Sequence, residues 1–101
     1  MQELIDLLSS RFAAGEASLD ATVQFAVGEE TVSFVIHQGQ LSVSSQAPDF
    51  TLYFADQHTL SAVLGDMQQA LIAFREQRFR SSGYILWTFQ VLGMFSPQGT
   101  G

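Results

Sequence analysis

Four runs in which apolar and polar residues alternate constrain the fold of this chain more than any other feature. They span residues 22–27, 31–37, 41–44 and 50–55, and the turns "GEE" and "QGQ" separate the first three. Alternation with a period of two is typical of strands with one buried face, and short turns containing glycine join antiparallel neighbours. We therefore expect a meander of three strands followed by a fourth strand. The inward residues are Val23, Phe25 and Val27, then Val32, Phe34 and Ile36, then Leu41 and Val43, and finally Phe50, Leu52 and Phe54.

Helical periodicity flanks these strands on both sides. Residues 2–14 carry apolar residues at helical spacing, and Gly15 is expected to end that helix. Asp56 is a suitable N-cap for a short helix that ends at Gly65, and Asp66 is a suitable N-cap for the next, with Gln69 three residues later. Residues 78–82 form a short expected fifth strand. The apolar stripe predicted for the helix after Asp66 is Met67, Ala70, Leu71 and Phe74.

The segment 84–95, "YILWTFQVLGMF", has no charge and only two polar residues, Thr88 and Gln90. A membrane span needs about 20 apolar residues, so this segment is too short to cross a bilayer. Its secondary structure is ambiguous: as a strand it would place Ile85, Trp87, Phe89 and Val91 on one face. As a helix it has no clean wet face, because Thr88 falls between Tyr84 and Phe95. Such a segment fills a core, forms a self-association surface or walls a ligand cavity.

Charge and composition narrow the classes of function. The chain has 101 residues, which indicates one domain, and ten acids face four arginines with no lysine, for a net charge of −6. This balance disfavours binding to nucleic acid and docking on anionic membranes. The absence of cysteine excludes disulfides and thiolate sites. Acidic residues near the start of the sequence argue against a signal peptide, and we therefore expect a cytoplasmic protein.

The order of these motifs resembles the sterol carrier protein type 2 (SCP2) family. The matching pieces are an alternating strand pair leading to Gln38-Gly39, "PDFTLYF", "LSAVLG", "ALIAF", a basic strand leading to Gly83, and the final apolar segment. With the N-terminal helix the resemblance covers nearly the whole chain, and we expect a single domain over 1–96 with a flexible tail over 97–101. The chain departs from the family at Gln77, where Gly is usual, and at Tyr84, where Asp or Asn is usual.

The resemblance implies an α+β fold: a twisted, mostly antiparallel sheet of about five strands with helices packed on one face. It also implies an apolar tunnel between sheet and helices, closed by a final helix over 84–95. The residues expected to line the ligand site are Phe34, Ile36, Phe54, Met67, Leu71, Phe74, Trp87, Val91, Met94 and Phe95. The residues that could hold an anionic headgroup at the tunnel mouth are Arg75, Arg78 and Arg80, although surface pairing with Glu76 and other acids is the simpler explanation of these arginines.

No catalytic or metal chemistry is indicated by the sequence. His37 and His58 lack a partner at ligand spacing, and there is no nucleophile motif or phosphate-binding glycine loop. We therefore expect no enzyme activity, no metal and no cofactor.

Two functional hypotheses remain open. The first is a non-catalytic binding or carrier domain for an apolar, lipid-like small molecule such as a fatty acyl, sterol-like or isoprenoid compound. The second is an accessory module that uses the same apolar groove to form a homodimer or to pair with an enzyme. Neither hypothesis involves nucleic acid or stable membrane insertion.

Overall fold

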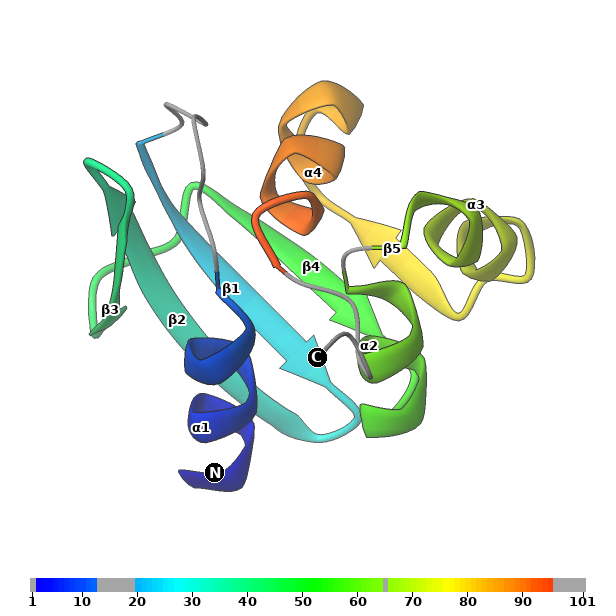
Figure 1. The fold of residues 1–101 in the computed structure, drawn as a ribbon, viewed down its shortest axis with the longest axis horizontal. Coiled ribbons are helices and arrows are strands. Elements are labelled where there is room, and N and C mark those ends of the chain that lie inside the picture. The colour runs from blue at the N-terminus through cyan, green and yellow to red at the C-terminus, as the bar shows by residue number, and fades with distance from the viewer. Residues whose placement is uncertain (1, 13–19, 65, 96–101) are drawn as a thin grey trace.

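The strands form one mixed sheet in the order β3-β2-β1-β4-β5 (Figure 1). The structure is a computed structural model that describes residues 2–12, 20–64 and 66–95. Within them the strands are β1 (Ala21–Val27), β2 (Glu30–His37), β3 (Gln40–Ser44), β4 (Phe50–Phe54) and β5 (Phe79–Ser81). The predicted fold class is therefore confirmed, including the short fifth strand.

The first three strands form the predicted antiparallel meander. Gly28 has a φ of 60°, while Gln38 and Gly39 have φ of 52° and 76°. In the turn between β2 and β3, both central residues, Gln38 and Gly39, therefore have positive φ. This is characteristic of the type I′ turn, whose twist matches that of a hairpin. β4 does not continue the meander: it crosses over and pairs in parallel with β1, with Phe25 opposite Leu52. β5 then adds antiparallel to β4, so three of the four pairings are antiparallel.

Helices cover one face of this sheet (Figure 1). They are α1 (Gln2–Arg11), α2 (Gln57–Val63), α3 (Met67–Arg75) and α4 (Ile85–Leu92). The predicted caps are present: the Asp56 carboxylate accepts from the backbone N–H of Thr59 at 2.7 Å, and Asp66 accepts from that of Gln69 at 3.2 Å. The hydrogen bonds from Thr59 hold the pKa of Asp56 below its ordinary value.

Two predicted helix ends were wrong. The last helix ends at Leu92 rather than at Phe95. The first helix ends at Arg11 rather than at residue 14, because Phe12 instead forms an isolated antiparallel bridge with Phe95. Their rings meet edge to face, with centroids 5.5 Å apart. The predicted stops at Gly15 and Gly65 and the tail over 97–101 lie outside the described residues.

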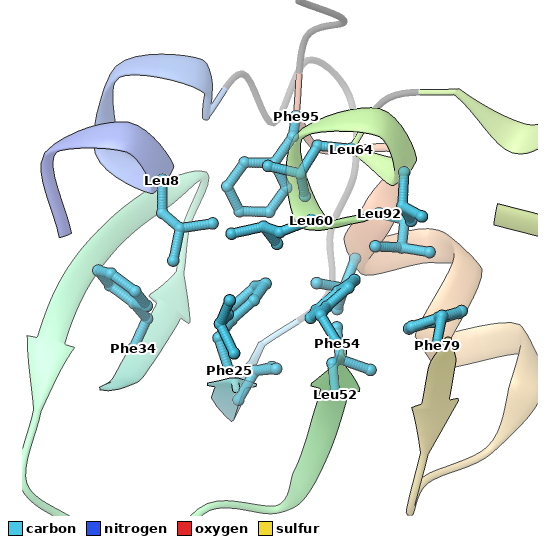
Figure 2. Close-up of a cluster of buried hydrophobic side chains, with 14 of the residues drawn as sticks. Leu8, Phe25, Phe34, Leu52, Phe54, Leu60, Leu64, Phe79, Leu92 and Phe95 are labelled. Atoms are coloured by element: carbon cyan, nitrogen blue, oxygen red, sulfur yellow. The ribbon is translucent and has the colours of Figure 1, made fainter. Parts of the chain in front are cut away.

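The core lies between the sheet and the helices α1, α2 and α4 (Figure 2). Phe25 is at its centre, and its ring contacts those of Phe34, Phe54 and Phe95. Leu8 covers this layer from α1 and Leu60 from α2, and both are completely buried. The inward residues predicted from alternation on β1, β2 and β4 are all buried here. On β3 the prediction was wrong for Val43, which is 58% exposed on this edge strand, while Leu41 is partly buried.

Arg11 joins two of the covering helices. Its guanidinium donates to the carbonyl oxygens of Ser61 and Leu64, at 3.1 and 3.0 Å, at the C-terminal end of α2. These carbonyls have no partner inside the helix, and a cation is favoured at this end of the helix dipole. Burial lowers the pKa of Arg11, but an arginine remains charged at neutral pH.

Candidate functional site

Large apolar side chains are exposed mainly on α3 and at the start of α4. They are Met67, Leu71, Ile72, Phe74, Tyr84, Ile85, Leu86 and Trp87, which we call the α3–α4 apolar surface. Elsewhere in the described residues only Val43 and Tyr53 are comparable. Exposed large apolar side chains that gather on a few elements of a small protein commonly mark a site of interaction.

The orientation of α3 explains half of this surface. Ala70 and Ala73 are the buried residues of the helix, and both are only 1% exposed. Small residues on the inner side allow α3 to pack closely, so its larger apolar residues project outwards. Of the predicted stripe, therefore, only Ala70 is buried, whereas Met67 and Leu71 are 50% exposed.

A hydroxyl pair explains the orientation of α4. Thr88 is 2% exposed, and its Oγ1 lies 2.7 Å from Oγ of Ser81 on β5. The same Thr88 hydroxyl donates to the carbonyl oxygen of Tyr84 at 2.9 Å. A buried hydroxyl needs such partners. Turning the polar residue inwards leaves Ile85 and Leu86 outside, 56% and 79% exposed.

Gly83 brings the start of α4 against β4. A Cβ atom at this position would lie 2.7 Å from Cβ and Cγ of Phe50, closer than side chains tolerate. Phe50 in turn supports Trp87, with ring centroids 6.2 Å apart. Trp87 also meets Tyr84 edge to face at 5.2 Å. Asp49, Phe50, Ser82, Gly83, Tyr84 and Trp87 line an open hollow of about 420 Å³.

The predicted ligand-site residues fall into two groups. Phe34, Ile36, Phe54, Val91, Met94 and Phe95 are buried in the common core, whereas Met67, Leu71, Phe74 and Trp87 belong to the α3–α4 apolar surface. The ring of Phe54 stacks on that of Phe79 with centroids 5.0 Å apart, and Figure 2 shows both rings below Leu92. The tunnel itself stays a prediction, as do the roles of these ten residues.

The three arginines have different surroundings. Arg78 is paired with Glu76, its Nε donating to Oε1 at 2.9 Å. Arg75 and Arg80 have no hydrogen-bond or ion-pair partner among the described residues, and both line an open hollow of about 650 Å³. Its other lining residues are Phe74, Gln77 and Phe79, and the rings of the two phenylalanines lie 6.3 Å apart. This hollow thus combines an aromatic wall with two cations.

Gln77 occupies a strained position beside that hollow. Its φ is 63°, in the left-handed region that glycine adopts most readily. The departure from the SCP2 pattern noted in the sequence therefore falls where the backbone favours glycine. The second departure, Tyr84, leaves α4 without a side-chain hydrogen bond at its N-cap.

Several residues of this region were not predicted for the site. Ile72, Gln77, Phe79, Tyr84, Ile85 and Leu86 were all omitted. The lack of a wet face on 84–95 was the available signal for Tyr84, Ile85 and Leu86. It could not show which side of the helix would be turned outwards.

No cluster of metal-binding side chains is present in the described part of the chain. His37 lies at the end of β2 with its Nδ1 3.5 Å from a carboxylate oxygen of Asp20, and both side chains are exposed. Nor do the described residues contain a helix long and apolar enough to span a bilayer.

Solved structures with the same fold are known, although no family model and no curated protein sequence matches the chain. The SCP2 domain of the ubiquinone synthesis protein UbiJ is 17% identical, with a TM-score of 0.69 over 92% of this chain and 85% of that one. The sterol carrier protein domain 2 of Helicoverpa armigera is 15% identical, with a TM-score of 0.54 over 87% of this chain and 79% of that one. The chain therefore has an SCP2-like fold, as the sequence resemblance implied.

The same fold also matches part of a larger enzyme. The inverting sec-alkylsulfatase Pisa1 from Pseudomonas sp. is 16% identical, with a TM-score of 0.70 over 92% of this chain. This chain spans only 16% of the sulfatase.

Proposed function

We propose that this protein is a non-catalytic binding or carrier domain for an apolar, lipid-like ligand. The observation that carries the proposal is the α3–α4 apolar surface, because a small protein seldom leaves eight large apolar side chains exposed on two helices. The fold supports it: two of the solved structures that share it are described as SCP2 or sterol carrier protein domains.

Burial of the ligand would supply the affinity. Covering a few hundred Å² of apolar surface contributes several kcal/mol at about 25 cal/mol per Å², before the cost of association. Met67, Leu71, Phe74 and Trp87 provide exposed wall on both sides of β5. The buried candidates Phe34, Ile36, Phe54, Val91, Met94 and Phe95 would form the inner wall of a tunnel that opens when a ligand enters.

The hollow beside β5 suits the polar end of such a ligand. Arg75 and Arg80 are free to bind a carboxylate or phosphate, whereas Arg78 would first have to leave Glu76. We propose fatty acyl, sterol-like or isoprenoid compounds as ligand classes, with a preference for those that end in an anionic group.

Titration with oleic acid and oleyl alcohol, monitored by the fluorescence of Trp87, tests the proposal. We expect a saturable change with one site per chain and tighter binding of the acid. Leu71→Ser should weaken binding of both ligands, while Arg75→Gln with Arg80→Gln should weaken binding of the acid more. Val43→Ser is the matched control, because Val43 is 58% exposed but lies on the distant edge strand β3. No saturable response to either ligand would contradict the proposal.

A second candidate is an accessory module that pairs with an enzyme or with another copy of itself. The observation that favours it is the occurrence of this fold as part of the sec-alkylsulfatase chain. Sedimentation velocity across a range of concentrations distinguishes the two. A dimer that Leu71→Ser dissociates, with no response to lipid, would favour the accessory role.

A further inference from the structure

The charge of the chain is divided unevenly along its length. Residues 1–66 contain nine acids and Arg11, for a net charge of −8, whereas residues 67–101 contain Glu76 and three arginines, for a net charge of +2. The second part also holds all eight residues of the α3–α4 apolar surface. The net charge of −6 therefore conceals a cationic and apolar part within an acidic protein.

The free arginines are connected to the exposed start of α4 by a series of surface hollows along β5. Arg75 and Arg80 share the hollow of about 650 Å³. A second hollow, of about 430 Å³, is lined by both Arg80 and Ser82. A third hollow is lined by Ser82 together with Tyr84 and Trp87. Cationic and apolar groups thus follow one another along one edge of the molecule.

The first turn of α4 forms an apolar end to this edge. Tyr84 and Leu86 are 72% and 79% exposed, the highest values among the large apolar residues described. In Figure 1 this turn lies at the upper limit of the molecule, far from α1 and α2. Its Tyr84 and Trp87 are residues that favour the boundary between water and hydrocarbon, because each has an apolar ring and a polar tip.

We propose that this edge docks on the surface of an anionic phospholipid bilayer. Leu86, with Tyr84 and Trp87 beside it, enters the headgroup region, while Arg75 and Arg80 approach lipid phosphates. Apolar burial and attraction of basic residues to anionic lipid act together in such contacts, and each arginine near the surface contributes about a fivefold gain in affinity. The uncapped backbone N–H groups at the start of α4 add to the positive potential there.

The acids close to this edge are few. Glu76 is paired with Arg78, and Asp49, which lines the hollow beside Trp87, accepts from the backbone N–H of Thr22 at 2.8 Å. The acidic remainder of the protein would be repelled from the bilayer, which orients the molecule. A symmetric dimer through the same edge would bring the free arginines of both copies together, so charge favours a membrane over a second copy.

Flotation with vesicles tests the inference without any soluble ligand. We expect the full chain to bind vesicles of phosphatidylcholine with 30% phosphatidylglycerol, and to bind pure phosphatidylcholine vesicles much more weakly. Binding should fall as the salt concentration rises, because salt screens the exposed charges. Emission of Trp87 should shift to shorter wavelength, and phospholipids brominated near the headgroup should quench it.

Matched variants locate the contact. Leu86→Ser should reduce binding severalfold at little cost in stability, and Arg75→Gln with Arg80→Gln should reduce it by roughly 25-fold, from fivefold for each residue. Arg78→Gln and Val43→Ser serve as controls and should change it little. Asp49→Asn should strengthen binding to the anionic vesicles.

Three outcomes would overturn the inference: equal binding to neutral and anionic vesicles, absence of binding to both, or a loss with Val43→Ser as large as that with Leu86→Ser. Concentration-dependent dimerisation that Leu86→Ser abolishes, without vesicle binding, would assign the edge to a protein contact instead. Because the oleic acid titration uses no vesicles, carrier binding and membrane docking can fail independently.

Discussion

The half of the molecule under α1 and α2 differs sharply from the half formed by α3, β5 and the first turn of α4. In the first, Leu8, Phe25 and Phe34 are completely buried, whereas in the second Leu86 is 79% exposed. Both halves are rich in apolar residues, so composition does not explain the contrast. The first half has helices laid across the sheet, and the second has α3 beside an edge strand of three residues. Burial thus depends on how many elements cover a segment.

A matched pair of substitutions gives the largest test of this contrast. Phe25→Ala should lower the free energy of unfolding by about 3–5 kcal/mol, because three aromatic rings pack on Phe25 and would border the cavity. Phe74→Ala should cost about 1 kcal/mol or less, because that ring is 46% exposed. Urea denaturation measures both. Equal losses would show that α3 is as well packed as the core.

Arg11 tests how the well-packed half is held together. Arg11→Leu should cost about 2–3 kcal/mol, because the carbonyls of Ser61 and Leu64 lose their charged donor. The same change at exposed Arg75 is the control and should be nearly neutral. Hydrogen exchange should show faster exchange in α2 for the Arg11 variant alone. A loss spread evenly over the sheet would contradict a local role.

Gly83 tests how the second half is attached to the sheet. Gly83→Ala should cost about 1–2 kcal/mol, because the added Cβ would meet Phe50 at 2.7 Å. The emission of Trp87 should also change, since its ring lies on Phe50. At Gly93 the nearest atom to an added Cβ is 3.4 Å away, so Gly93→Ala should be close to neutral. Equal effects of the two alanines would contradict the close approach at Gly83.

A substitution at Gln77 should give the smallest change in stability, and this change should be a stabilisation rather than a loss. Gln77→Gly should stabilise the protein by about 0.5–1 kcal/mol, because glycine adopts a φ of 63° with less strain. Gln90→Gly, within α4, should instead destabilise it by about 1 kcal/mol. Thermal unfolding compares the two. If Gln77→Gly is stabilising but weakens binding of oleic acid, the side chain belongs to the ligand site.

The sequence by itself determined the strands, the caps at Asp56 and Asp66, and the SCP2-like order of elements. These depend on local signals: alternation, turn glycines, and a carboxylate placed before a helix. It also fixed the inward residues of β1, β2 and β4, because a period of two leaves only one choice once one face is buried.

Only the tertiary structure decided which apolar residues remain outside. Nothing local shows that β4 pairs in parallel with β1, that Ser81 draws Thr88 inwards, or that Ala70 and Ala73 turn the large residues of α3 outwards. Each of these is a contact between side chains or strands whose partners are set by the path of the chain. For that reason the residues of 84–95 were compatible with a strand or a helix. The SCP2 resemblance implied the helix, and neither signal showed which side would be exposed.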